Sequence, residues 1–198
     1  MTKISRVKCS TGEDWLSWPV GTLSPAISRA ESKFAGDLET VSRVIETLHS
    51  SDQRLGALGA AVAGLWIPDG QTGSILGEFW AGLQHEPEAD LHSTLRYKRS
   101  ITQRRSADVT VFSQSIADFV VHDTEAVTLV ENCAEDNGRP LVRVTVVYFP
   151  AGIVRPILRA ICFIPTLAKP FTTAIGQIAG TVTWAADETE DTTEMPDA

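Results

Sequence analysis

Five basic side chains gather in one short stretch, and they are the residues in this chain most suited to binding a charged partner. This basic strip consists of Arg96, Lys98, Arg99, Arg104 and Arg105, with Tyr97 among them. Such a density of guanidinium and ammonium groups can hold a phosphate, an acidic peptide or a nucleic-acid backbone. The same charges can also protect the exposed edge of a sheet from pairing with another chain. We interpret the strip first as a charged edge strand and second as a docking site for an acidic protein segment.

A second group combines imidazoles with carboxylates, the ligand types that zinc and similar divalent ions accept. Its members are His85, Glu86, Glu88, Asp90 and His92. The two histidines are not at the i, i+4 spacing that places both on one helical face, and Pro87 favours a loop. We therefore expect a solvated acidic loop and no metal.

Motifs for covalent catalysis or cofactor binding are missing from the sequence. His122 precedes Asp123 near an expected strand end, and adjacent residues of a strand point to opposite faces, so they make no dyad by themselves. Residues 73–77 read G-S-I-L-G, with the serine one place too early for a nucleophile elbow. Neither a G-x-G-x-x-G loop nor a P-loop occurs. We expect no cofactor and no catalytic residues, which makes an enzyme the less favoured class.

The net charge of −8 is concentrated at one end of the chain. Six of the eight excess negative charges come from carboxylates in residues 187–198, namely Asp187, Glu188, Glu190, Asp191, Glu194 and Asp197. We expect this acidic tail to be disordered, because it holds few apolar side chains. The remaining residues are nearly neutral and exert no general attraction on nucleic acid or anionic membranes.

Cysteine usage and hydropathy indicate a reduced, cytoplasmic protein. Cys9, Cys133 and Cys162 are odd in number and show no C-x-x-C spacing, and Cys162 sits in an apolar run typical of a buried structural thiol. Residues 55–68 and 170–186 are two uncharged stretches, and both fall short of the roughly 20 apolar residues that a spanning helix needs. No apolar leader follows the basic N-terminus.

One strong helical pattern lies near the N-terminus. Residues 1–27 hold Trp15, Trp18 and several prolines and glycines, so we expect a segment that wraps the domain, with at least one tryptophan packed on the core. Apolar residues then recur at spacings of three and four at Phe34, Leu38, Val41, Ile45 and Leu48. This pattern predicts one amphipathic helix over residues 29–49, with Ser28 and Glu31 as a capping box and these five side chains buried.

Short runs rich in Val, Ile, Thr and aromatic residues follow the helix and predict strands. They cover residues 58–67, 74–83, 95–102, 109–115, 126–133, 141–149 and 157–164. A final helix is expected over residues 169–179, and residues 181–184 fit either a closing strand or the end of that helix. Hairpin-length connections favour an antiparallel sheet. We expect one α+β domain over residues 28–186, with six or seven strands and a helix at each end.

This order of elements resembles the PsbP-like α+β sandwich. The missing catalytic motifs, together with the acidic tail and the basic strip, favour an accessory or regulatory module that docks a partner through a sheet edge or the basic strip. The partner we expect is a protein with an acidic segment. The alternative is a small enzyme or ligand carrier with a cavity between sheet and helices, which would use His85, His92 or His122 as a base.

Overall fold

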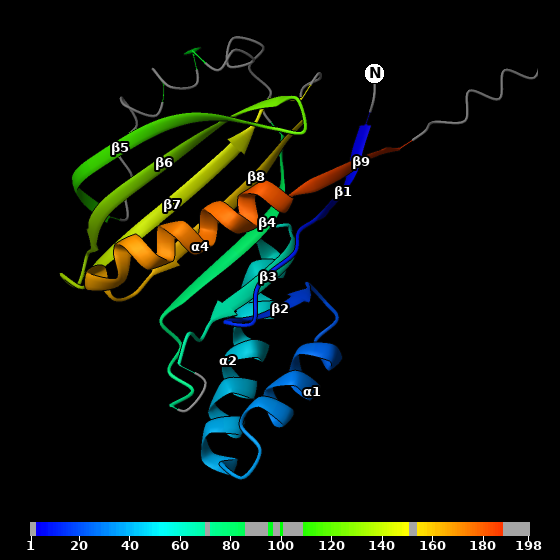
Figure 1. Cartoon of the computed structure of the whole chain (residues 1–198), viewed down its shortest axis with the longest axis vertical. Helices are drawn as coiled ribbons and strands as arrows, with labels where there is room; N and C mark the ends of the chain where they lie inside the picture. Colours follow the sequence, from blue (N-terminus) through cyan, green and yellow to red (C-terminus); the bar gives the residue numbers. More distant parts are fainter. Residues whose placement is uncertain are drawn as a thin grey trace, which may run out of the picture.

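A seven-stranded antiparallel sheet organises the chain (Figure 1). The computed structural model describes residues 3–69, 72–85, 95–96, 100, 109–150 and 154–187. The strand order in the sheet is β2-β3-β4-β8-β7-β6-β5, and β1 and β9 form a separate antiparallel pair. The strands are β1 Lys3–Lys8, β2 Trp15–Pro19, β3 Ala60–Trp66, β4 Gly77–His85, β5 Val109–Val121, β6 Thr124–Glu135, β7 Pro140–Tyr148, β8 Val154–Cys162 and β9 Thr183–Asp187. The expected α+β class with a mainly antiparallel sheet is confirmed.

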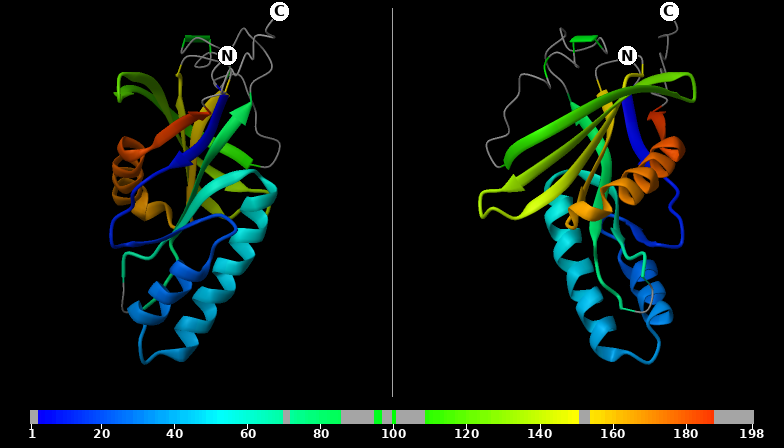
Figure 2. Two further views of the ribbon diagram at one scale, coloured as in Figure 1. Left: turned by 90° about the vertical axis from the view of Figure 1, so that its right-hand side faces the viewer. Right: turned by 60° about the vertical axis from the view of Figure 1, so that its left-hand side comes forward.

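Helices lie on both faces of this sheet. They are α1 Ser24–Lys33, α2 Leu38–Ala57 and α4 Ala168–Thr181. A 3-10 turn, η2 Pro165–Leu167, precedes α4. Figures 1 and 2 show α4 lying across the sheet, while α1 and α2 sit together at one end of the molecule. No helix in the described part of the chain is long and apolar enough to cross a membrane.

The expected single helix over residues 29–49 is wrong, because two helices occupy this region. Gly36 adopts a φ of 98°, a left-handed conformation that interrupts the helix, and Asp37 then caps α2 by accepting a 3.0 Å hydrogen bond from the Thr40 amide. Ser28 lies inside α1 and does not act as the N-cap, so the predicted capping box is also wrong. The sequence signals for this boundary were Gly36 and the Asp37 that follows it, because glycine interrupts helices and Asp is a typical N-cap residue.

The buried stripe of α2 differs from the predicted one. Thr40, Val44, Leu48, Ser51 and Leu55 are buried, whereas Leu38 is 84% exposed. Leu38 is the first residue of α2, so its side chain projects from the helix end and does not reach the sheet. The expectation that Leu38 is one of the buried side chains is therefore wrong.

Most predicted strands are present with shifted ends. The β3–β4 and β6–β7 pairs are antiparallel neighbours as expected, and β9 shows that residues 183–187 form the closing strand. The strand expected over residues 95–102 is wrong where it can be judged, since Leu95, Arg96 and Ser100 are helical. The strand expected over residues 109–115 extends to Val121, which makes β5 thirteen residues long.

The face that carries α4 is a continuous apolar core. Val142, Val144, Val146 and Tyr148 of β7 alternate onto this face and pack with Phe171, Ile175 and Ile178 of α4 in one buried cluster. Trp15, expected to pack on the core, lies 6.1 Å from the Phe171 ring and 5.0 Å from the Phe79 ring. The Tyr148 hydroxyl donates a 2.8 Å hydrogen bond to the Ala179 carbonyl, so the polar atom is satisfied inside the core.

The opposite face is covered in two separate patches. Helices α1 and α2 cover β2 and β3 through a cluster that contains Trp18, Leu48 and Leu65. A smaller buried cluster of Val127, Leu129, Val147 and Ile157 lies on β6, β7 and β8. Trp80 of β4 is partly buried and packs against both clusters, so it marks the boundary between them.

Candidate functional site

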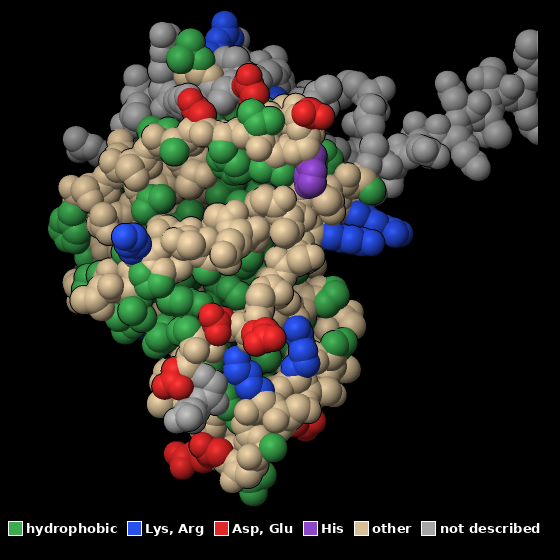
Figure 3. All heavy atoms as spheres, in the orientation of Figure 1, with side chains coloured by type: hydrophobic (Ala, Val, Ile, Leu, Met, Phe, Trp, Pro, Cys, Tyr) green, Lys and Arg blue, Asp and Glu red, His purple; other side chains and the backbone are tan. Residues whose placement is uncertain are grey.

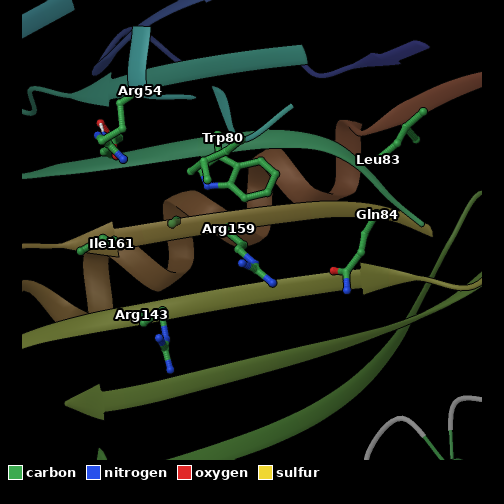
Figure 4. A pocket seen from close by; sticks show the side chains of 10 residues that line it. Arg54, Trp80, Leu83, Gln84, Arg143, Arg159 and Ile161 are labelled. Carbon is green, nitrogen blue, oxygen red and sulfur yellow. Dashed lines mark hydrogen bonds and ion pairs between the residues drawn. The ribbon is translucent and has the colours of Figure 1, made fainter. Parts of the chain in front are cut away.

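A groove of about 470 Å³ opens at this boundary, between the last turn of α2 and the sheet face that α4 does not cover. Trp80 and Arg159 lie at its middle, with Arg54, Ile161 and Arg143 toward one end and Leu83 and Gln84 toward the other (Figure 4). The strand register produces this arrangement, because Trp80 lies opposite Arg159 across β4 and β8, and Arg143 lies opposite Ile161 across β7 and β8. Three neighbouring strands and one helix therefore supply one site.

Arg54 is fixed at the groove by a buried carboxylate. Its Nη2 atom lies 2.6 Å from Oε1 and 2.5 Å from Oε2 of Glu78, and the Ser51 hydroxyl donates a 2.8 Å hydrogen bond to Oε2. The Glu78 side chain is only 7% exposed, whereas that of Arg54 is 53% exposed. The ion pair thus anchors the end of α2 to β4 and leaves part of the guanidinium facing the groove.

Arg143 and Arg159 are held in two further ways. The Arg143 Nε atom donates a 2.7 Å hydrogen bond to Oε2 of Glu131 on β6. The Arg159 guanidinium carbon lies 5.6 Å from the centroid of the Trp80 ring, within the distance of a cation–π contact. Arg54, Arg143 and Arg159 thus bring three guanidinium groups to one groove, in a chain whose net charge is −8.

Apolar side chains complete the groove. Leu58 is 58% exposed at the end of α2, and Leu83 and Ile161 are partly buried on β4 and β8. An exposed leucine beside a half-buried tryptophan is the kind of surface that a partner side chain can cover. The groove therefore offers both cationic and apolar contacts.

The ionisable side chains of the described lining are arginines and one glutamate. Among the described residues that form the groove there is no Ser, Thr, Cys or His, and the carboxylate of Glu78 is already engaged by Arg54 and Ser51. Elsewhere in the described part of the chain, no cluster of three or more His, Cys, Asp or Glu side chains could hold a metal ion. The chemistry that the groove supports is recognition of anionic and apolar groups.

The residues that the sequence singled out lie away from the groove or outside the described residues. Arg96 is exposed and helical, while Lys98, Arg99, Arg104 and Arg105 lie outside the described residues, so the basic strip stays a prediction. His85 ends β4, and residues 86–94, which include His92, lie outside the described residues as well. His122 and Asp123 form the β5–β6 turn with φ values of 47° and 60°, and both are exposed.

Sequence reasoning missed Arg143 and Arg159, although a signal was present. In β7 and β8 the odd-numbered residues point away from α4, and each strand places an arginine at such a position among β-branched residues. A charged residue within an otherwise apolar strand could have been flagged. That the two strands are neighbours, and that α2 ends beside them, could not be deduced from spacing.

The thiols and the space beneath α4 do not form a second polar site. Cys133 and Cys162 are buried, as expected for Cys162, and burial raises the pKa of both thiols. Burial also raises the pKa of Cys9 to about 12, so it stays protonated at neutral pH. The cavity between α4 and the sheet measures about 130 Å³ and is lined mostly by apolar residues. That volume is below the range typical of ligand pockets.

A second exposed feature is the outer edge of β5. Within the described part of the chain, β5 ends the sheet, and no strand pairs with its outer side. Phe112 and Val120 on this strand are 68% and 66% exposed. This edge is formed by residues 109–121 and not by the basic strip that the sequence predicted as an edge strand.

Comparison with known proteins adds little beyond the fold class. No protein-family model matches the chain, and no curated protein is similar to it in sequence. Among solved structures, the chain is similar to cyanobacterial PsbP from Synechocystis sp. PCC 6803, with 8% identity, a TM-score of 0.41, and coverage of 90% of this chain and 92% of that one. It is also similar to PA94 of Pseudomonas aeruginosa, a protein of unknown function and candidate regulator, with 13% identity, a TM-score of 0.35, and coverage of 60% and 72%.

Proposed function

We propose that this protein is a non-catalytic interaction module that docks an acidic segment of a partner protein in the groove at Trp80. The observation that carries the proposal is the set of three arginines, Arg54, Arg143 and Arg159, around one apolar floor. Carboxylates form strong charge-assisted hydrogen bonds with guanidinium groups. A segment with acidic residues on either side of an apolar residue matches this arrangement.

Arg159 and Trp80 form the centre of the proposed contact. Tryptophan and arginine are the residue types that most often dominate binding energy at interfaces. The cation–π contact between them, at 5.6 Å, holds the guanidinium in place before a partner arrives. Ion pairs with Glu78 and Glu131 hold Arg54 and Arg143 in the same way, so little side-chain entropy remains to be lost on binding.

Charge supports a protein partner over nucleic acid. Apart from its acidic tail the chain is nearly neutral and exerts no general attraction on a nucleic acid, whereas a short acidic segment needs only the guanidinium groups of the groove. The basic strip Arg96, Lys98, Arg99, Arg104 and Arg105 belongs to the connection that leaves β4 beside Gln84, at one end of the groove. We propose that the strip adds to the same attraction.

The test is binding of a fluorescein-labelled peptide of alternating Glu and Ala around a central Leu, followed by fluorescence anisotropy. We expect Arg159→Ala to weaken binding about tenfold, because a hydrogen bond to a charged group contributes roughly 1.5–3 kcal/mol. Binding should also weaken as the salt concentration rises. The matched control is Lys169→Ala, which removes an exposed positive charge from α4 on the opposite face.

Two outcomes would contradict the proposal. Equal affinity for a peptide with Gln in place of Glu would show that carboxylates are not recognised. Equal weakening by Arg159→Ala and Lys169→Ala would show that the effect is one of overall charge and not of the groove. An Arg104→Glu, Arg105→Glu variant tests the basic strip separately.

A carrier of small anionic ligands is the second candidate, and the groove volume favours it. About 470 Å³ falls within the range of ligand pockets, and the groove lies between the sheet and a helix as that hypothesis requires. Citrate, a small tricarboxylate, distinguishes the two functions. Tight citrate binding that Arg159→Ala abolishes, together with no binding of the peptide, would favour the carrier.

A further inference from the structure

The β5–β6 hairpin determines which backbone groups β5 presents at its outer edge. Val121 and Thr124 flank a two-residue turn, and the positive φ values of His122 and Asp123 are those of a type I′ turn. The flanking residues of such a turn form a hydrogen-bonded pair, and the pairs alternate along the ladder. The odd-numbered residues from Ser113 to Val121 therefore bond to β6. Gln114, Ile116 and Val120 direct their N–H and C=O groups outward.

The two edges of the sheet differ in how they are protected. The β2 edge is only five residues long and ends at Pro19. Helix α1 is tied to it by Arg29, which donates a hydrogen bond to the Ser17 carbonyl. Helix α2 is tied to it by Asp52, which accepts a 2.8 Å hydrogen bond from Trp18 Nε1. The β5 edge is thirteen residues long, contains no proline, lysine or arginine, and exposes Phe112 and Val120. A long edge with a single charge and exposed apolar side chains is a template for pairing with another strand.

We propose that β5 pairs with β5 of a second copy of this chain, antiparallel, across a twofold axis at Ile116. In this register Ile116 lies opposite its own counterpart, and Gln114 lies opposite Asp118 of the other copy. Phe112 lies opposite Val120 of the other copy at both ends. All these residues are at even-numbered positions. Their backbone N–H and C=O groups point outward, except at Phe112, where β5 has a bulge. The hydrogen-bonding groups of the two edges therefore meet.

The sequence of β5 is what favours a second copy over an unrelated strand. The residues at every second position from Phe112 to Val120 alternate as apolar, polar, apolar, polar, apolar. An identical strand that runs in the opposite direction therefore places apolar residues opposite apolar ones and polar residues opposite polar ones. Asp118 is the only charged residue of β5, and this register does not place two carboxylates opposite each other. A twofold interface requires such self-complementarity.

This inference is independent of the proposed function. The groove is built by β4, β8, β7 and α2, whereas the pairing involves β5 alone. Binding of the acidic peptide can fail while the dimer exists, and the reverse also holds.

The register is tested by disulfide trapping. Ser115 and Ala117 are exposed, and the proposed register makes them a non-hydrogen-bonded pair across the interface, whose Cα atoms are typically about 4.5 Å apart. We expect a Ser115→Cys, Ala117→Cys double variant to give a disulfide-linked dimer under mild oxidation, as seen on a non-reducing gel. The matched control, Ser113→Cys, Ala117→Cys, places its cysteines out of register and should remain mostly monomeric. Equal cross-linking of both variants, or of neither, would overturn the proposal.

A second measurement does not depend on engineered cysteines. We expect the molar mass measured by light scattering during size-exclusion chromatography to rise from monomer to dimer with protein concentration. Val120→Lys should raise the dissociation constant about tenfold or more, since it places a charge opposite Phe112 of the other copy. Gln53→Lys, on the exposed side of α2, adds the same charge away from the edge and should leave the dimer intact. A monomer at every concentration, in a protein with normal thermal unfolding, would refute the pairing.

Discussion

The two faces of the seven-stranded sheet share the same strands, but only one is closed by a helix along its length. On the face under α4, one buried apolar cluster reaches from Trp66 on β3 to Val121 on β5. On the other face, two apolar clusters are separated, and the arginine-lined groove lies where they meet at Trp80. Figure 3, which views the α4 side, shows few charged side chains over α4 and more over α1 and α2.

The difference indicates what each face is for. The one polar side-chain group that β7 sends under α4 in the described structure, the Tyr148 hydroxyl, is satisfied by the Ala179 carbonyl. On the other face β7 and β8, which are central strands, carry Arg143 and Arg159. Protection against aggregation explains charges on edge strands, not on central ones. Charged groups at the centre of a sheet that a helix only partly covers support the docking role that we propose for this face.

The largest difference that we predict between the two faces is in how much a substitution on each lowers the free energy of unfolding. Phe171 is fully buried and lies 5.2 Å from the Trp66 ring, so Phe171→Ala should lower the free energy of unfolding by about 3–5 kcal/mol. Arg159→Ala should lower it by about 1 kcal/mol or less, because the side chain is exposed and its contact with Trp80 is a single cation–π interaction. Urea unfolding measures both. Similar losses for the two variants would show that the groove face is structural.

A smaller predicted effect is the pH dependence of the unfolding free energy, to which a thiol packed against the α4-face core contributes. Burial under the α4 face raises the pKa of Cys9 from its usual value near 9 to about 12. A thiol with a raised pKa in the folded state stabilises the fold fully below pH 9, and this contribution is lost as the pH rises toward 12, because the unfolded chain ionises first. We expect unfolding free energy to fall less steeply over pH 9–12 in Cys9→Ala than in the natural protein. Parallel profiles would mean that Cys9 is accessible to water when folded.

Tyr148 adds to the same alkaline dependence. Its pKa is raised mainly by burial and secondly by Cys9 nearby. Some loss of stability above pH 10 should therefore remain in Cys9→Ala.

The sequence predicted hairpins better than helix ends. The short connection between the strands predicted at residues 126–133 and 141–149 is a hairpin loop that contains Asn137 and Gly138, with Gly138 at a φ of 80°. Local turn chemistry is sufficient to define such a connection. The break at Gly36 and Asp37 was missed because the apolar spacing continues through it from Phe34 to Leu48. Periodicity records which residues could share a face, but it does not record where the backbone stops being helical.

The groove was beyond sequence reasoning for a different reason. Arg54, Trp80, Arg143 and Arg159 are far apart in the chain and meet only through the strand order β4-β8-β7 and the end of α2. The sequence did indicate that β7 turns one apolar face to the core. It could not show that the other face remains open beside a helix, since non-local pairing determines which strands are neighbours.

The most direct test of the account is to map where an acidic segment binds, with ¹H–¹⁵N NMR spectra of the full chain recorded during addition of the Glu-rich peptide. We predict shifts of the Trp80 indole N–H signal and of backbone amides near Arg143 and Arg159, with the amides of α4 unchanged and the shifts lost in Arg159→Ala. Shifts confined to α4 or to the β1–β9 pair, or persisting unchanged in Arg159→Ala, would contradict the assignment of the open face as the docking surface.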